Sequence, residues 1–423
     1  MKLGSRLARL AIATQLVAIV GCGGNQDAAA ALARLNRCMQ REAILCLVDH
    51  RGVEFAALFD GTPRTTVVAL ALLGGPPEPR LAELLRDWPR WRPSSLPDDV
   101  GILFVEQPSI EWSESCTALN TSYWRTVRAG VPDVALANRV ATDCVTEEFG
   151  PGLAAWVSAI NLAVASIPQR VEGVVASSFG AAESDLLLSR SMLRPKWRIA
   201  ASPTFGGRSG DALLNERAKA GARRIAALGL PTDFLVRLDT DRQVQGRAVT
   251  LIRSDVAFAL ARGMDEPAEV IHALVQGDMP ANVLVGQLSD AFSQRYGSDD
   301  YGSRSLTYWT WFCTSFGWTS DPDRISRIPD GMSIEFTLHW VLDAVHAPCG
   351  GMNTDHDRVR SHSAVPTLDL VPSHDGLASA GRPADVIVEI DTYDHSVLAY
   401  RSGCLGRAVK QFLDDLEGTN QQC

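Results

Sequence analysis

The segment Ala176-Ser177-Ser178-Phe179-Gly180 is well suited to nucleophilic chemistry, because its serines lie between a predicted strand and a predicted helix. A sharp strand-to-helix turn needs small residues two positions before and two positions after its apex. Ala176 and Gly180 meet that need if the apex is Ser178, whereas an apex at Ser177 would put Phe179 where a small residue belongs. We therefore predict Ser178 as a nucleophile, the alternative being an ordinary turn with a capping serine.

A nucleophilic serine needs a base, and the base needs a carboxylate to orient it. Asp375 follows a predicted strand at 365–370, and His395 follows another at 386–390. The carboxyl ends of parallel strands meet at one edge of a sheet, where open α/β sheets place their active sites. The chain order Ser, Asp, His therefore predicts a triad of Ser178, Asp375 and His395.

Two neighbouring residues, His374 and Asp394, are the main alternates for the base and the acid. Residues 355–362 hold two aspartates and two histidines with side chains that can bind metal. They lie in a polar, irregular stretch typical of a solvated linker. We expect neither a metal nor an organic cofactor.

The turn at Gly74-Gly75 follows an apolar run and offers the backbone N–H of Gly75 to an oxyanion, paired with that of Phe179. A plain turn at the end of a strand is the alternative.

The elements around these residues alternate between strand and helix. Buried strands are predicted at 65–73 and 100–105, with a crossover helix at 81–88 between them. Apolar residues at helical spacing predict a helix over 152–166. Further strands, over 171–176 and 197–201, continue a parallel sheet covered by helices on both faces.

From about residue 208 to 360 helical patterns dominate, for example at 249–261 and 268–275. A mostly helical insertion is predicted there. Its aromatic residues cluster at Tyr308, Trp309, Trp311, Phe312, Phe316 and Trp318. The strands at 365–370 and 386–390 then return, and a final helix is expected over 405–416.

The beginning of the chain has the features of a secretory signal. A positively charged start is followed by apolar residues 10–20, a stretch too short to span a bilayer comfortably. It ends at Cys22 in a sequence that resembles a bacterial lipobox, which predicts lipid attachment there; an ordinary signal peptide is the alternative. The net charge of −9 argues against nucleic acid as a partner.

The remaining cysteines fit an exported protein, because their even number suggests disulfides and none lies in a CxxC pair. Sequence alone does not fix their pairing. The simplest set joins sequence neighbours: Cys38 with Cys46, Cys116 with Cys144, Cys313 with Cys349, and Cys404 with Cys423.

Several of these motifs resemble those of the secreted tripeptidyl or prolyl aminopeptidase group of α/β-hydrolase serine peptidases. Residues 73–77 (LGGPP) stand where that group has HGGPG, and residues 105–109 (VEQPS) where it has a strand running into DQRG. Residues 176–180 match its elbow G-x-S-Y-G. The strand before Asp375, the residues 395–398 (HSVL) and the late Cys404 with FLDD in the final helix also match.

The sequence departs from that pattern at several positions. Leu73 replaces the histidine of HGGPG, Pro108 and Ser109 replace the arginine and glycine of DQRG, and Ala176 replaces the first glycine of the elbow. The interval from Asp375 to His395 is also short for the usual intervening helix. The resemblance therefore implies the fold and the triad more directly than the substrate.

We predict an α/β protein of the α/β-hydrolase class, with a mostly parallel central sheet flanked by helices and an inserted helical lid. The expected segments are a lipoprotein signal peptide at 1–22, a tether at 23–44, core at 45–207, a helical lid at 208–360 and core again at 361–423.

The expected function is that of an exported, lipid-anchored and monomeric serine hydrolase that removes short peptides from N-termini through an acyl-enzyme. An esterase on the same core and a non-catalytic binding lipoprotein are the alternatives. The expected partners are a small peptide or ester substrate and the membrane that holds the anchor, and not nucleic acid.

The variant Cys22→Ala should abolish lipid attachment, because no other residue of the signal segment provides the thiol that is acylated. Metabolic labelling with a fatty acid, followed by separation of membrane and soluble fractions, measures this. Unchanged membrane retention of the variant would contradict the lipoprotein hypothesis.

Overall fold

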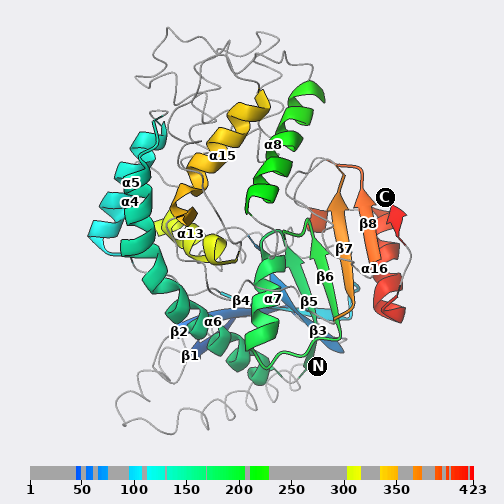
Figure 1. The fold of residues 1–423 in the computed structure, drawn as a ribbon. Helices are drawn as coiled ribbons and strands as arrows, with labels where there is room; N and C mark the ends of the chain where they lie inside the picture. Colours follow the sequence, from blue (N-terminus) through cyan, green and yellow to red (C-terminus); the bar gives the residue numbers. More distant parts are fainter. Residues whose placement is uncertain are drawn as a thin grey trace, which may run out of the picture.

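The computed structural model describes the central sheet and the helices around it (Figure 1). None of the helices in the described part of the chain is long and apolar enough to cross a bilayer. The described residues are 44–48, 54–60, 65–74, 95–106, 112–128, 131–167, 169–204, 210–227, 303–315, 334–350, 365–373, 386–392, 397–399, 402–417 and 420–423.

Nine strands form one sheet in the order β1-β2-β4-β3-β5-β6-β7-β8-β9. Strand β2 is antiparallel to both β1 and β4, and every pairing from β4 to β9 is parallel. This arrangement confirms the predicted α/β-hydrolase fold. The strands are β1 (Ile44–Val48), β2 (Glu54–Asp60), β3 (Val67–Leu72), β4 (Val100–Val105), β5 (Arg170–Ser177), β6 (Trp197–Ala201), β7 (Thr367–Pro372), β8 (Val386–Ile390) and β9 (Gln421–Gln422).

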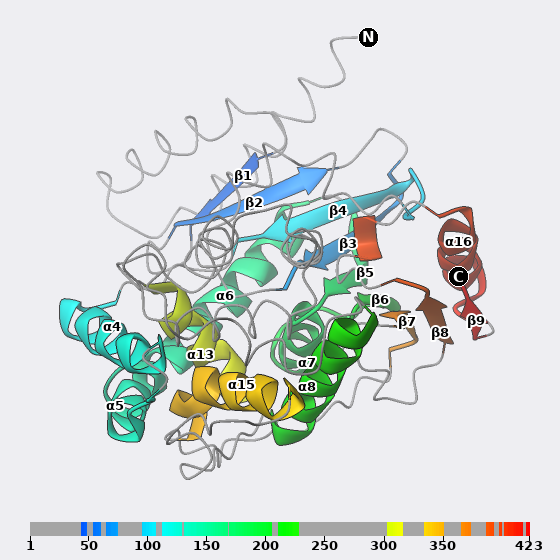
Figure 2. The same cartoon turned by 90° about the horizontal axis from the view of Figure 1, so that it is seen from above.

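Helices precede and follow the central strands along the chain, and Figure 2 shows α6, α7 and α15 gathered on one side of the sheet with α16 beside β8 and β9. The helices described are α4 (Glu114–Arg128), α5 (Val134–Val140), the π-helix η1 (Ala141–Val145), α6 (Thr146–Ser166), α7 (Gly180–Arg190), α8 (Gly210–Ala227), α13 (Ser303–Ser315), α15 (Ile334–Gly350), the 3-10 helix η2 (Val397–Ala399) and α16 (Gly403–Asp415).

The central strands β3, β4 and β6 are buried on both faces, as a parallel sheet requires. Successive residues of a strand point to opposite faces. In β3, Val68 and Leu70 accordingly pack into a core with α6 and α7, while Ala69 and Ala71 pack into a second core with α16. The apolar runs of β3 and β4 in the sequence are therefore buried central strands.

Several predicted elements have the observed bounds. The strands predicted at 100–105, 197–201 and 386–390 coincide with β4, β6 and β8. The helix predicted over 152–166 begins earlier, at Thr146, because it continues from η1. The crossover helix at 81–88 and the helices at 249–261 and 268–275 lie outside the described residues.

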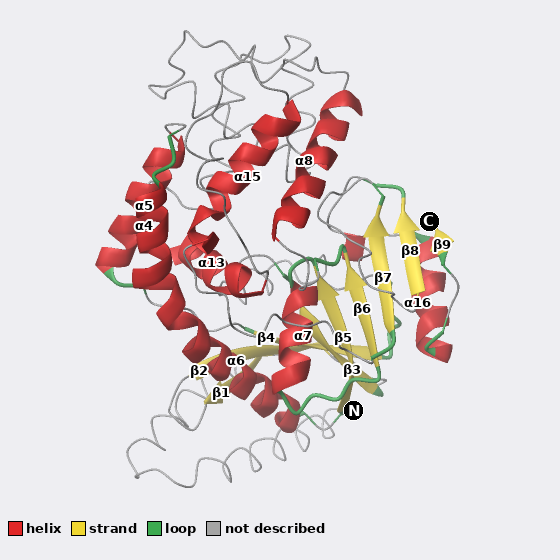
Figure 3. Ribbon diagram, in the orientation of Figure 1, coloured by secondary structure: helices red, strands yellow, loops and turns green. Residues whose placement is uncertain are grey.

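The described helices of the predicted insertion follow β6 and precede β7. In Figure 3, α8 and α15 lie beyond the carboxyl ends of the parallel strands, and α13 lies below α15, near α6. Helix α15 packs against both α8 and α13. The assignment of residues 208–360 as a helical lid, and the other segment boundaries given above, remain predictions.

Three of the four expected disulfides are present. Cys116–Cys144 joins α4 to η1, Cys313–Cys349 joins α13 to α15, and Cys404–Cys423 ties the end of the chain to α16. The fourth expected pair, Cys38–Cys46, and the lipidation residue Cys22 lie outside the part of the chain whose side chains are described.

A buried ion pair fixes α7 to the sheet. Arg198 Nη1 in β6 lies 2.8 Å from Asp185 Oδ1 in α7, and both side chains are 1% exposed. The same guanidinium donates to Ser184 Oγ at 3.1 Å and, through Nε, to Thr367 Oγ1 of β7 at 3.2 Å. One side chain thus links α7, β6 and β7.

Arg198→Met should lower the free energy of unfolding by about 3–5 kcal/mol, because it leaves the Asp185 carboxylate buried without its cation. Urea unfolding measures the change. A matched control is Lys196→Met: Lys196 also lies 2.8 Å from a carboxylate, that of Glu172, but is 59% exposed. Its effect should stay below about 1 kcal/mol. Equal losses from the two variants would contradict a special role for the buried pair.

Candidate active site

Ser178 occupies the apex of a sharp turn between β5 and α7. Its φ is +53°, in the left-handed region that few residues other than glycine adopt. Ser177, by contrast, is the last residue of β5 and pairs in register with Ala201 of β6. The structure therefore places Ser178, rather than Ser177, in the position that a nucleophile elbow gives to its nucleophile.

The backbone of Ser178 is hydrogen-bonded on both sides. Its N–H donates to the carbonyl oxygen of Ala201 at 2.8 Å. Its carbonyl oxygen accepts from the N–H of Ala181, in the first turn of α7, and from the N–H of Thr204, each at 3.1 Å. The turn is thus held by the helix that follows it and by the segment after β6.

Two glycines permit this turn because the end of β3 lies directly against it. A Cβ on Gly74, whose φ is +68°, would lie 2.1 Å from the carbonyl oxygen of Ser177. A Cβ on Gly180 would lie 2.2 Å from the carbonyl oxygen of Leu72. Neither position has room for a side chain, so the glycine turn after β3 and the elbow are packed as one unit.

This contact bears on the predicted oxyanion site. Gly74 approaches the backbone nitrogen of Phe179, to which a Cβ on Gly74 would be 3.0 Å away. The turn after β3 therefore begins beside one of the two expected donors, the N–H of Phe179. The other expected donor, Gly75, lies outside the described residues.

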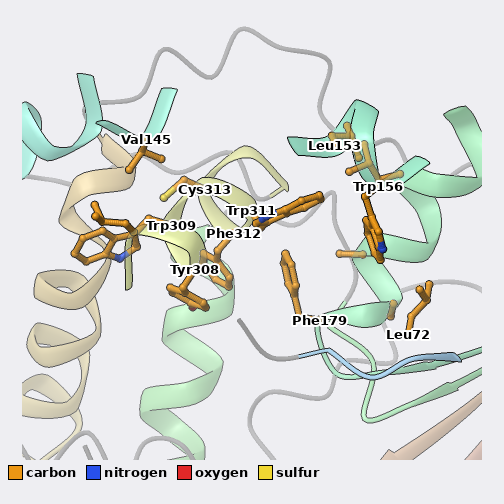
Figure 4. Close-up of a cluster of buried hydrophobic side chains, with 14 of the residues drawn as sticks. Leu72, Val145, Leu153, Trp156, Phe179, Tyr308, Trp309, Trp311, Phe312 and Cys313 are labelled. Carbon is orange, nitrogen blue, oxygen red and sulfur yellow. The ribbon is translucent and has the colours of Figure 1, made fainter. Parts of the chain in front are cut away.

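Buried aromatic rings cover one side of the elbow (Figure 4). The ring of Phe179 stacks on Phe312 of α13, with centroids 5.9 Å apart. Trp156 of α6 meets Trp311 of α13 edge to face at 5.4 Å. Phe179, Phe312, Trp156 and Trp311 are all at most 6% exposed, so water is excluded from this side of the turn.

The stack continues from Phe312 to a buried histidine of α15. Phe312 lies 4.8 Å, between ring centroids, from both Tyr308 and His346. Nδ1 of His346 lies 2.7 Å from the carbonyl oxygen of Leu342, which can only accept, so Nδ1 carries the proton. The hydroxyl oxygen of Tyr308 lies within hydrogen-bond distance of Nε2, at 2.8 Å. These two contacts fix the rings of His346 and Tyr308 beside the elbow.

The predicted acid and base, Asp375 and His395, lie outside the described residues, as do the alternates His374 and Asp394 and the metal-capable residues 355–362. The strands that lead to them are described. Strands β7 and β8 run parallel to β5, so all three end at the same edge of the sheet. The N–H of Ser373, after β7, donates to the carbonyl oxygen of Ile390, the last residue of β8, at 2.9 Å. The chain therefore enters both predicted segments at the edge where Ser178 lies.

Sequence reasoning missed the residues that support the turn. The role of Thr204 depends on a backbone contact, which leaves no mark in the residue type. Phe312 belongs to the aromatic cluster noted in the sequence, and an aromatic run on a helix is a signal for a buried helix. Arg198, in an otherwise apolar strand, is a sequence signal for a buried partner.

No family model and no curated protein matches the sequence. Among solved structures, a proline iminopeptidase-related protein of Thermus thermophilus is similar at 14% identity and a TM-score of 0.36, over 88% of this chain and 98% of that one. A proline iminopeptidase of Mycobacterium smegmatis has 11% identity and a TM-score of 0.38, over 88% and 97%. An esterase from Rhodococcus has 11% identity and a TM-score of 0.32, over 90% of this chain and 89% of that one. Similarity at this level does not identify an activity.

Gly74→Ala should destabilise the protein by about 2 kcal/mol or more, because alanine is strained at positive φ and its Cβ would overlap the Ser177 carbonyl. Gly406→Ala is the control: no atom lies within 4 Å of a Cβ on this glycine inside α16. That change should stabilise by about 0.5–1 kcal/mol, because alanine is the better helix former. Thermal unfolding of both variants measures the difference, and a stable Gly74→Ala protein would contradict the close contact.

Proposed function

We propose that this protein is a serine hydrolase that uses Ser178 as its nucleophile and forms an acyl-enzyme. The observation that supports this most directly is the left-handed backbone of Ser178 at the junction of β5 and α7. Strain of this kind persists only where the surrounding structure enforces it, and it concentrates at functional sites. The two close glycine contacts and the hydrogen bonds to the Ser178 backbone are what enforce it here.

In this proposal the Ser178 hydroxyl attacks the carbonyl carbon of the substrate, and its proton passes to His395. Asp375 orients the imidazole and stabilises its charge. The N–H groups of Phe179 and Gly75 bind the oxyanion as the tetrahedral intermediate forms. His395 then returns the proton to the leaving amine or alcohol. In the second half of the reaction His395 takes a proton from a water molecule, which attacks the acyl carbon, and the Ser178 oxygen leaves and regains its proton from His395.

The aromatic rings beside the elbow favour this chemistry. Hydrogen bonds and dipoles act more strongly on a developing charge where water is excluded. Phe179, at 6% exposure, has its ring stacked on Phe312 and its backbone in the turn, so the proposed donor belongs to a rigid part of the core.

We propose short peptides with a free N-terminus as substrates, on the basis of the motif resemblance described above. An ester substrate would use the same nucleophile and oxyanion site. We also propose that the mature enzyme works outside the cytoplasm, anchored through Cys22, where the three disulfides would be stable.

Ser178→Ala should abolish covalent labelling of the purified protein by a fluorophosphonate, whereas Ser177→Ala should keep most of it. Both changes remove one hydroxyl from neighbouring half-buried positions, so the second is a matched control for the first. His395→Ala should lower the labelling rate by about a thousandfold or more, because an unassisted hydroxyl is a poor nucleophile at neutral pH. Mass spectrometry of the labelled peptide identifies the modified serine.

Three outcomes separate the possible functions. Turnover of aminoacyl and peptidyl amides supports the peptidase, and turnover restricted to acyl esters supports an esterase on the same core. A folded wild-type protein that neither labels nor hydrolyses either panel would reject the enzyme and favour a binding protein with a hydrolase fold.

A further inference from the structure

A second serine in the left-handed region lies one strand away from Ser178. Ser202, directly after β6, has a φ of +46° and is fully buried. Its conformation is doubly unfavourable, because a side chain with a Cβ is strained at positive φ and because the following residue, Pro203, favours an extended conformation for the residue before it. The surrounding contacts must therefore enforce it.

The contacts of this turn lead to Ser178. On one side of Ser202, the carbonyl oxygen of Ala201 accepts the N–H of Ser178 at 2.8 Å. On the other side, the N–H of Thr204 donates to the carbonyl oxygen of Ser178 at 3.1 Å. The two peptide groups of Ser178 are thus held by residues that flank Ser202.

The turn is itself anchored to the sheet. The N–H of Ser202 donates to the carbonyl oxygen of Leu370 in β7 at 2.8 Å. An extended conformation at Ser202 would carry the chain away from β5, and the N–H of Thr204 could then no longer reach Ser178. Positive φ at Ser202 is what lets one short segment contact both β7 and the elbow.

We propose that Ser202 is a positioning residue, whose left-handed conformation holds the backbone of Ser178 in its own left-handed conformation. The role of Ser202 in catalysis rests on the proposed function, in which Ser178 is the nucleophile. The structural coupling between the two serines does not depend on that function. The proposal assigns no contact with substrate to Ser202. The two strained turns form one unit, with Thr204 as the link.

Ser202→Thr tests the coupling, because threonine keeps the hydroxyl and adds one methyl group that makes positive φ still less favourable. Ser202→Gly is the comparison without backbone strain, since glycine adopts this conformation freely. The matched control is Leu416→Val, which places a β-branched residue at a φ of +55° at the end of α16, beside the second core and not at the elbow. Ser202→Ala, which removes only the hydroxyl and adds no strain at positive φ, separates the side-chain oxygen from the backbone conformation.

The first measurement is amide hydrogen exchange of the full-length protein, followed by mass spectrometry of peptides that contain Ser178 and Thr204. Ser202→Thr should speed exchange in both peptides, while Ser202→Ala, Ser202→Gly and Leu416→Val stay near wild type there. The second is fluorophosphonate labelling, resolved into inhibitor binding and the rate of bond formation. Ser202→Thr should slow bond formation at least about tenfold with little change in binding, because small misplacements of a reacting group are costly.

If both peptides of the Ser202→Thr variant exchange at the wild-type rate, the proposal is overturned. An equal slowing of bond formation in Leu416→Val would also overturn it, because the effect would then reflect general loss of stability. Absence of labelling in the wild-type protein would reject the proposed function alone, since the exchange experiment still decides whether Ser202 holds the elbow.

Discussion

The close contact between the end of β3 and the start of α7 is the constraint on which the candidate site depends. Gly74 and Gly180 bring two backbone segments together at a distance that leaves no space for a Cβ on either residue. With α7 this close to β3, the chain turns sharply as it leaves β5, and Ser178 adopts the left-handed conformation at that turn. The serine hydroxyl, the helix N-terminus and the glycine turn therefore come together as consequences of one packing requirement.

A strained turn persists only if the elements around it cannot move apart, and three kinds of interaction meet that need. The buried pair Arg198–Asp185 fixes α7 to β6 and β7. The ring of Phe179 is fixed from the other side by Phe312 of α13, which Cys313–Cys349 joins to α15. The segment after β6 holds the Ser178 backbone itself. Charge, aromatic packing and backbone hydrogen bonds thus act on the same few residues from different directions.

The sequence allowed the sheet and the turn to be predicted because both follow from local patterns. Residues 100–105 (VGILFV) form a short apolar, β-branched run that favours a buried strand, and the small residues around Ser178 identify the apex of a turn. The pair β1–β2 was not predicted, because its place depends on pairing with β4, far along the chain. The contacts of Phe179 with Phe312 and of Ser178 with Thr204 were missed for the same reason. Local sequence patterns do not reveal contacts between residues that are far apart in the chain.

The departures from the aminopeptidase-like motifs acquire a physical meaning in the structure. The glycines that the chain keeps, Gly74 and Gly180, stand where any Cβ would overlap a carbonyl oxygen. The elbow position where it has alanine, Ala176, is a buried strand residue whose methyl group is accommodated in the core. The histidine position before the glycine turn holds Leu73, which packs against the second core. Gly74 and Gly180, which this chain shares with the motifs, are thus positions at which the described structure leaves no space for a Cβ. The strained serine between those two glycines is the feature on which the proposed nucleophilic role rests.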